Sequence, residues 1–223
     1  MSEDSHLVIA PHPDDELLGC GGTLLRAKAE GQEIHWATLT EVKEEYGYSS
    51  DRVQSRTAEI AKVSTGMGFD SHTSLGFRPA GLDESQLGEL IGSLGKLIEA
   101  VQPSIVYLPF SGDVHSDHRL VFNAGMACAK WFRYPSVRKV MSYEILSETD
   151  FSLSRTEVFL PNYFVNIANY LDRKLELLGL YESELGEFPF PRSLKAVSSL
   201  AAVRGVSSGY TAAEAFMVLR ERE

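Results

Sequence analysis

The sequence predicts an α/β fold with a mostly parallel sheet. Short apolar runs alternate along the chain with longer segments in which apolar residues recur every three or four positions. The runs within residues 7–10 and 104–109 are continuously apolar, as expected of strands buried on both faces. With 43% hydrophobic and 23% charged residues, the 223-residue chain has the balance of a soluble globular protein, which excludes a disordered or fibrous one.

The individual elements are predicted from continuous or alternating apolar residues for strands and from apolar residues every three or four positions for helices. Strand 7–10 ends at a Pro-His-Pro turn, and helical spacing then continues over residues 16–29, where Gly31 provides a stop. Asp83 is suited to cap the expected helix 83–101. The remaining expected strands are 34–39, 73–77, 104–109, 137–145, 163–167 and 215–219, and the remaining expected helices are 52–65, 83–101, 117–132, 171–184 and 193–203.

We expect residues 1–223 to form one domain. The chain contains no internal repeat or low-complexity tract, and the loop 186–191 is too short and too aromatic for a flexible linker. The glycines at 19, 21 and 22 fall inside a predicted helix instead of at its opening turn, which favours close helix–sheet packing over dinucleotide binding.

Composition also narrows the partners and the compartment. The net charge of −10, from 21 basic and 31 acidic residues, disfavours nucleic acid. No run approaches the roughly 18 apolar residues of a membrane span, and the acidic start is unlike a secretory signal, so we expect a cytoplasmic protein. Two cysteines are too few for a disulfide framework or a CxxC zinc site. Assembly into a homo-oligomer is compatible with this composition.

The strongest chemical signal is Pro-His-Pro-Asp-Asp-Glu at residues 11–16, directly after the first strand. Prolines on both sides hold His12 in a rigid turn, which suits a metal ligand. His12 and Asp15 are three residues apart and can converge on one point, while Asp14 aims elsewhere. The alternative is structural: the three carboxylates would cap the following helix and favour its dipole.

A second cluster, Asp-Val-His-Ser-Asp-His at residues 113–118, follows the buried strand 104–109. Ligand sites of open α/β sheets form beyond the carboxyl ends of the strands, so we expect the two clusters to meet there. His115 and His118 are three residues apart, and only one of them needs to bind a metal.

Together the clusters offer His12, Asp15 and His118, two nitrogens and one oxygen with a fourth position left for water. That is the ligand set of a catalytic zinc site, although iron(II) or another divalent cation could use the same residues. A zinc ion lowers the pKa of its bound water and polarises a carbonyl, which indicates hydrolysis of an amide or ester. Asp14 is then free to act as the general base.

Two further roles complete this hypothesis. His115, if Asp117 holds it, can be an imidazolium that stabilises an oxyanion or protonates a leaving amine. The competing functions are a catalytically silent metal- or carbohydrate-binding module and an iron(II) oxygenase. Hydrolysis is favoured because a binding module has no use for a free carboxylate at Asp14.

The two motifs resemble those of the PIG-L/LmbE-like zinc-dependent de-N-acetylases. The resemblance implies a Rossmann-like three-layer fold with the site at the C-terminal ends of the strands, and a small-molecule substrate carrying N-acetylglucosamine. It also implies site roles: His12, Asp15 and His118 as metal ligands, Asp14 as base, and His115 with its partner Asp117 as catalytic auxiliaries. Weaker similarity extends through Arg56-Thr-Ala-Glu59, Leu75-Gly76, 174–184 and 204–216.

Two loops depart from the family pattern, and both are expected to border the site. Residues 40–48 replace a short turn with a longer acidic segment, and 77–81 lacks an acidic residue before its glycine. Arg56 is expected either to contact a substrate hydroxyl or phosphate or to form a surface ion pair with Glu59. Asp113 is a second expected substrate-binding residue.

Overall fold

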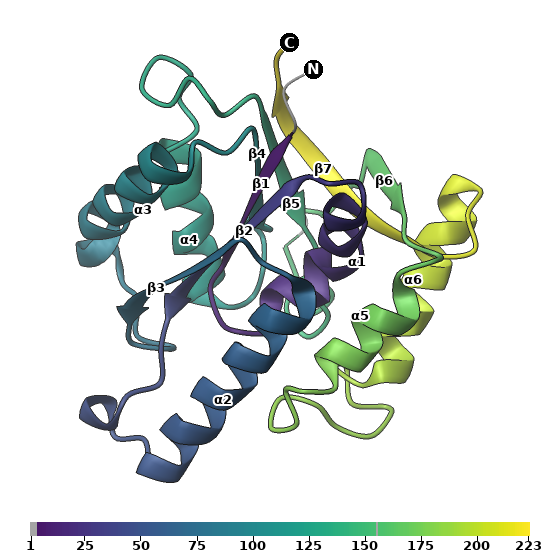
Figure 1. Ribbon diagram of the computed structural model, residues 1–223, viewed down its shortest axis with the longest axis horizontal. Coiled ribbons are helices and arrows are strands. Elements are labelled where there is room, and N and C mark those ends of the chain that lie inside the picture. The colour runs from purple at the N-terminus through teal and green to yellow at the C-terminus, as the bar shows by residue number, and fades with distance from the viewer. Residues whose placement is uncertain (1–3, 155) are drawn as a thin grey trace.

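One seven-stranded sheet organises the molecule, as the computed structural model of residues 4–154 and 156–223 shows (Figure 1). The strand order is β3-β2-β1-β4-β5-β7-β6. The first five of these strands pair in parallel, and β7 runs antiparallel to both of its neighbours. The predicted mostly parallel sheet is confirmed. Of the acidic N-terminal segment, residues 1–3 lie outside the described residues.

The bounds of the elements agree closely with the expected ranges. The strands are β1 Ser5–Ala10, β2 Glu33–Thr40, β3 Ser71–Phe77, β4 Ile105–Pro109, β5 Lys139–Tyr143, β6 Tyr163–Asn166 and β7 Ala213–Glu221. The helices are α1 Asp15–Ala29, α2 Ser50–Met67, α3 Leu87–Val101, α4 Ser116–Ala127, α5 Leu171–Leu178 and α6 Leu194–Ser208. Short 3₁₀ turns cover Glu44–Tyr46 and Glu84–Gln86, and Asp83 caps the second of them.

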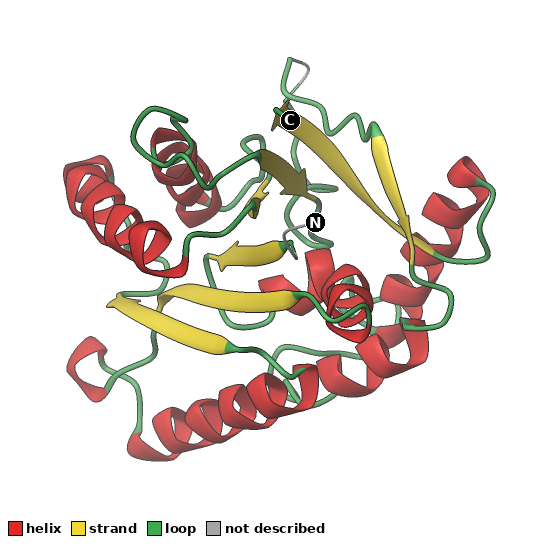
Figure 2. Cartoon of the chain, turned by 45° about the horizontal axis from the view of Figure 1, so that its top comes forward, coloured by secondary structure: helices red, strands yellow, loops and turns green. Residues whose placement is uncertain are grey.

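Helices cover both faces of the sheet, which gives three layers (Figure 2). Leu7 and Ile9 of β1 pack in the core beneath α3 and α4, whereas Val8 and Ala10 pack in the core shared with α1 and α5. Successive strand residues point to opposite faces, so a strand covered on both sides must be apolar throughout. This burial explains the uninterrupted apolar run in β1.

Several expected boundaries differ from the observed ones. The sixth helix ends at Ser208 instead of residue 203, and α3 begins at Leu87 instead of residue 83, because a 3₁₀ turn precedes it. The fourth helix ends at Ala127 instead of residue 132, and α5 ends at Leu178, where Gly179 follows, instead of at residue 184. The last strand covers Ala213–Glu221 and is longer than expected because it pairs with both β5 and β6. Long-range pairing of this kind leaves no local signal in the sequence.

The glycines of α1 pack closely, as predicted. A side chain at Gly19 would collide with the ring of Tyr143 in β5, and one at Gly22 would collide with Ile167. The helix can therefore lie directly on the sheet and on the segment after β6.

A buried ion pair, Lys174 and Glu214, forms hydrogen bonds with backbone groups in the middle of α1. Glu214 of β7 accepts hydrogen bonds from the backbone N–H groups of Gly22 (2.8 Å) and Thr23 (2.7 Å) and from the Thr23 hydroxyl (2.6 Å). Lys174 of α5 donates to Glu214 (2.7 Å) and to the carbonyl of Leu18 (2.9 Å). Since Lys174 and Glu214 are 3% and 5% exposed, the pair fixes α1 from inside the protein.

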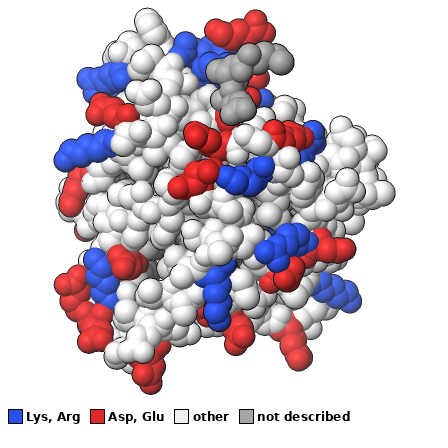
Figure 3. All heavy atoms as spheres, in the orientation of Figure 1, with Lys and Arg blue, Asp and Glu red and all other residues white. Residues whose placement is uncertain are grey.

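The sheet brings the two predicted clusters together. Strands β1 and β4 are parallel neighbours, so the segments that follow them leave the sheet at the same edge. On the face drawn in Figure 3, acidic and basic side chains are interspersed without a continuous basic surface. Within residues 4–154 and 156–223, no helix has the length and apolar character that crossing a membrane would require.

Candidate metal-dependent active site

The turn after β1 holds Asp14 in a strained backbone conformation. Its φ of 130° lies in the region that favours glycine. The backbone N–H of Asp14 donates to the Glu16 carboxylate (3.0 Å), and the hydroxyl of Tyr181 donates to the other oxygen of Glu16 (2.9 Å). Glu16 is fully buried, so these contacts hold the turn in a conformation that Asp14 would not adopt alone.

His12, Asp15 and His118, the predicted ligands, lie close enough together to hold one cation, and we call them the ligand group. One ligand atom from each lies within 4.8 Å of the others. Asp15 Oδ2 is 3.3 Å from His12 Nδ1 and 3.5 Å from His118 Nε2. Metal–ligand distances of about 2.0–2.1 Å in a tetrahedron place ligand atoms about 3.3–3.4 Å apart, so these residues fit a zinc-sized cation.

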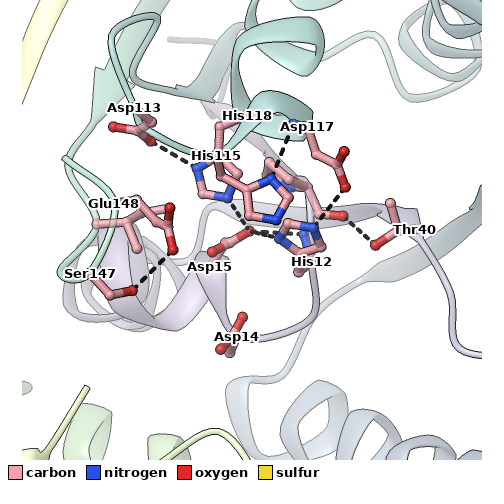
Figure 4. Close-up of polar contacts among 12 residues, drawn as sticks. His12, Asp14, Asp15, Thr40, Asp113, His115, Asp117, His118, Ser147 and Glu148 are labelled. Atoms are coloured by element: carbon pink, nitrogen blue, oxygen red, sulfur yellow. Dashed lines mark hydrogen bonds and ion pairs between the residues drawn. The ribbon is translucent and has the colours of Figure 1, made fainter. Parts of the chain in front are cut away.

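In each histidine of this group, the ring nitrogen that does not face Asp15 lies next to a buried carboxylate (Figure 4). His12 Nε2 is 3.0 Å from Asp117, and His118 Nδ1 is 2.8 Å from Asp113. Carboxylates in this position fix the tautomer and the orientation of metal-binding histidines. This arrangement is a second indication, independent of the ligand spacing, that the group is built for a cation.

The structure corrects the expected partners of His115 and Asp113. The Asp117 carboxylate contacts His12 and the backbone N–H of Ala80 (2.9 Å), not the His115 ring. His115 instead accepts the backbone N–H of Asp117 at Nδ1 (3.1 Å), because it is the N-cap of α4. Asp113 is 0% exposed and lies behind His118, so it is not placed to contact a substrate.

A second group, His12, His115 and Asp117, also has ligand atoms within 4.8 Å of one another. Its ligand atoms are less available. The single lone pair of His115 Nδ1 accepts the N–H of Asp117, and both oxygens of Asp117 accept backbone N–H groups, from Ala80 and Leu82. In the first group only Asp15 Oδ2 accepts a backbone N–H, from His12 (2.8 Å), and this oxygen keeps a second lone pair. The group with Asp15 and His118 is therefore the better cation site.

The charges around the ligand group favour the binding of a cation. Burial alone would lower the pKa of His12, but its hydrogen bonds with Asp117 and Asp15 raise that pKa to about 10. Burial acts to raise the pKa of Asp15, but the charge of His118 and the contacts with His12 lower it to about 2. The carboxylates thus hold a proton on His12 that a divalent cation would replace.

Asp14 lies beside the ligand group without belonging to it (Figure 4). Burial and the neighbouring Asp15 carboxylate raise the pKa of Asp14 well above its usual range, against the charge of Arg192, whose Nη1 lies 3.5 Å from Asp14 Oδ2. A divalent cation in the group would favour the ionised carboxylate. Burial and the neighbouring His12 and His118 lower the pKa of His115 to about 4, so this ring is neutral near pH 7.

A cavity of about 290 Å³ opens in front of these residues. Both loops that were expected to border the site do so, through Thr40, Val42 and Tyr48 of one and Pro79 and Ala80 of the other. The other lining residues are His12, Pro13, Asp14, Asp15, Arg52, Arg56, His115, His118, Ile145, Ser147, Glu148, Glu184 and Arg192.

Arg56 also lines the cavity, and it is buried instead of lying on the surface. It is 5% exposed, forms an ion pair with Glu59 (3.3 Å) and contacts Glu184. The expected ion pair with Glu59 exists but is buried. Because Arg56 also lines the cavity, its contact with a substrate stays a prediction.

Sequence reasoning missed four polar lining residues on the C-terminal half of the chain. Ser147 and Glu148 follow β5, and Ser147 has a positive φ of 81°. Glu184 and Arg192 come from the segment between α5 and α6. The position of Ser147 and Glu148 beyond the end of a parallel strand is the one signal that could have identified them.

Comparisons with known proteins agree with this geometry. The family model of PIG-L, GlcNAc-PI de-N-acetylase, matches residues 7–129, more than half of the chain. A 1D-myo-inositol 2-acetamido-2-deoxy-alpha-D-glucopyranoside deacetylase from Mycobacteroides abscessus is 30% identical over 157 residues. That match covers 56% of this chain and 56% of the relative, so the chain aligns with little more than half of that protein.

Two further proteins align over most of the chain. A diacetylchitobiose deacetylase from Thermococcus kodakarensis is 25% identical over 222 residues, 93% of this chain and 80% of that protein. The crystal structure of a conserved protein from Thermus thermophilus has a TM-score of 0.79 at 28% identity, covering 98% of this chain and 96% of the other. The chain, with its three-layer fold and its two histidine–aspartate motifs, therefore belongs to the PIG-L family of de-N-acetylases.

Proposed function

We propose that this protein is a metal-dependent hydrolase that removes the N-acetyl group from an N-acetylated amino sugar or a conjugate of one, and that residues 1–223 act as one domain. Zinc is the proposed cation, with iron(II) or another divalent metal as alternatives. The observation that carries the proposal is the pairing of a three-ligand group, His12, Asp15 and His118, with an unligated carboxylate, Asp14, in one cavity.

His12, Asp15 and His118 would hold the cation, while Asp117 and Asp113 keep the two imidazole rings in place. A cation there would lower the pKa of a coordinated water and polarise the amide carbonyl of the substrate. The ligand set leaves one side of the group open toward the cavity, where the acetamide can enter.

Asp14 is proposed as the general base. Its carboxylate takes a proton from the attacking water and returns it to the amine nitrogen as the C–N bond breaks, so the products are acetate and a free amine. Arg192, 3.5 Å away, keeps the carboxylate oriented toward the cavity.

His115 is proposed to stabilise the oxyanion as a neutral donor, not as an imidazolium. Because its Nδ1 accepts the N–H of Asp117, the proton of the neutral ring is on Nε2. An N–H group that is already oriented in the cavity can hydrogen-bond the carbonyl oxygen as negative charge develops.

The direct test is acetate release from a panel of N-acetylglucosamine conjugates, with and without a chelator. We expect release that the chelator abolishes and that added zinc restores. Absence of acetate from the whole panel would favour a catalytically silent binding module of the same fold, and oxygen consumption in place of acetate would favour an iron(II) oxygenase.

The base assignment has its own test, Asp14→Asn. The substitution keeps the shape of the side chain and removes its basicity, so metal content should remain while kcat falls by roughly 10²- to 10⁴-fold. A metal-loaded Asp14→Asn variant with a kcat near that of the wild type would show that another group is the base, with Glu16 the next candidate among the buried carboxylates outside the ligand group.

A further inference from the structure

Arg192 differs from the other two arginines that line the catalytic cavity. Arg52 and Arg56 each donate a hydrogen bond to Glu184, whereas no N–H group of Arg192 donates one to any residue that the structure describes. Its Nε is buried without a partner, and its Nη1 lies 3.5 Å from Asp14 and 3.7 Å from Glu184, which is too far for a good hydrogen bond. Buried polar groups normally have hydrogen-bond partners, so this guanidinium has donors left for a ligand.

We propose that Arg192 is a specificity-determining residue whose guanidinium donates to an oxygen of the substrate, on a carbon next to the one that carries the acetamide. The inference rests on the proposed deacetylase function and deepens it by assigning a substrate contact to the segment between α5 and α6. Arg192 then recognises the substrate directly, in addition to orienting Asp14.

The backbone around Arg192 is fixed on both sides. Pro191 restricts its own φ, and Ser193 is the N-cap of α6, with its hydroxyl accepting the backbone N–H of Ala196 (3.2 Å). The guanidinium lies over the ring of Phe190, with 5.7 Å between Cζ and the ring centroid. These contacts place the cation without using its N–H groups, so an acceptor on the substrate would not have to displace a hydrogen-bond partner within the protein.

The direction of the proposed reaction decides which part of the substrate Arg192 meets. The acetamide carbonyl has to reach the cation and His115, and the nitrogen has to come within hydrogen-bond reach of Asp14, which returns the proton to it. Arg192 Nη1 is 3.5 Å from Asp14 Oδ2, so the guanidinium lies where the amine and the carbons next to it are held. In a 2-acetamido sugar two oxygens flank the nitrogen there, on C1 and C3, and Arg192 can donate to one of them.

The neighbouring carboxylates favour a neutral oxygen over an anionic group as the acceptor. Asp14 and Glu184 lie near the same Nη1 and already offset the charge of Arg192. An anionic substituent would face both carboxylates, and repulsion between like charges would oppose its binding. A hydroxyl or ether oxygen meets no such repulsion, and a hydrogen bond to a charged donor contributes more than one between neutral groups.

The test combines a variant of Arg192 with analogues of the substrate. Arg192→Met removes the N–H donors and keeps an unbranched side chain. The two analogues are N-acetylglucosamine without its 3-hydroxyl and N-acetylglucosamine without its 1-hydroxyl, so each lacks one oxygen next to the carbon that carries the nitrogen. The matched control is Lys195→Met, which removes the same charge from an exposed position of α6 outside the cavity lining, where the ammonium lies over the ring of Phe188 (4.4 Å).

The readout is kcat/KM for N-acetylglucosamine divided by kcat/KM for each analogue, a ratio that does not depend on the fraction of folded enzyme. For the wild type, the ratio for one analogue should be about tenfold or more, as expected when a hydrogen bond to a charged group is lost. In Arg192→Met the ratio for that analogue should fall by about tenfold, because the donor is absent with either substrate. Lys195→Met should keep the ratio within about twofold of the wild type.

Failure of this contact and failure of the proposed function give different results. Acetate release with equal ratios in the wild type and Arg192→Met overturns the contact alone, even where kcat falls, because Arg192 then acts only through Asp14. If no sugar yields acetate, the deacetylase function fails, and calorimetric titration with the same three sugars tests Arg192 separately. Weaker binding of one analogue to the wild type, but not to Arg192→Met, supports the contact, and equal or absent binding overturns it.

Discussion

The buried pair of Lys174 and Glu214 leads to a quantitative prediction for stability. Replacing Glu214 with Gln keeps the size of the side chain but removes its charge and one of its two acceptor oxygens. Four hydrogen-bond donors converge on the carboxylate: two backbone N–H groups and one hydroxyl from α1, and the ammonium of Lys174. The amide cannot accept all of them, and Lys174 is left with only the carbonyl of Leu18.

The expected loss in the free energy of unfolding is about 3–5 kcal/mol, the range for breaking a buried ion pair by removing one partner. That is a large part of the roughly 5–15 kcal/mol that stabilises a typical domain. Lys174→Met should cost less than Glu214→Gln, because Glu214 would keep its three donors from α1. The double variant should be less destabilised than the sum of the single ones, since neither side chain is then buried as an unpaired charge.

Denaturant unfolding of the four proteins measures these differences. The control is Glu30→Gln, which breaks the ion pair with Arg26 on the surface of the same helix, where the side chains of Arg26 and Glu30 are 40% and 47% exposed. We expect a loss of at most about 1 kcal/mol there. A Glu214→Gln variant within about 1 kcal/mol of the wild type would refute the view that this pair fixes α1.

Three further predictions concern the site, a loop and the pH dependence of stability. His118→Ala should lower both zinc content and activity, whereas His115→Ala should keep the metal and lose rate; full metal retention in His118→Ala, measured by elemental analysis, would contradict the ligand assignment. Shortening the 40–48 loop should change KM among N-acetyl substrates more than kcat for a minimal substrate, and unchanged selectivity would place the loop's influence elsewhere. Burial lowers the pKa of His6 below 6.5 in the folded chain, so the unfolded chain binds the proton more tightly, and the free energy of unfolding should fall as the pH drops below 6.5. His6→Gln should flatten that slope in unfolding experiments between about pH 5 and 7, and an unaltered slope would assign it to other groups.

The sequence predicted that His12, Asp15 and His118 lie close together because the signals for this cluster are local. His12 and Asp15 share one turn, and His118 lies in a second polar cluster after another buried strand. The only long-range step was the rule that parallel strands leave a sheet at one edge, and the adjacency of β1 and β4 satisfies it. Most strands and helices were predictable for the same reason: their periodicity is contained in the segment itself.

The hydrogen-bond partners of the site residues could not be predicted in this way. The spacing of the motif suggested that Asp117 holds the ring of His115, two residues away. In the structure the His115 ring is the N-cap of α4 and accepts the backbone N–H of Asp117. The Asp117 carboxylate instead contacts His12, which is 105 residues away in sequence. Arg192 reaches Asp14 from a loop with no recognisable motif. Contacts of this kind depend on how the elements pack, which no local pattern encodes.

The density of acidic groups at the strand ends links the stability of the site to its chemistry. Five carboxyl groups are buried within this one region: Asp14, Asp15, Glu16, Asp113 and Asp117. Two helices, α1 and α4, begin there, and the partial positive charge at each N-terminus offsets only a fraction of that acidity. A proton on His12 offsets more of it, since the contacts with Asp117 and Asp15 raise the pKa of His12 to about 10. Burial and the Asp15 carboxylate raise the pKa of Asp14 as well. A divalent cation would take over the role of the His12 proton and lower the pKa of Asp14, so that the event that completes the ligand group also favours the ionised carboxylate that can accept a proton from water.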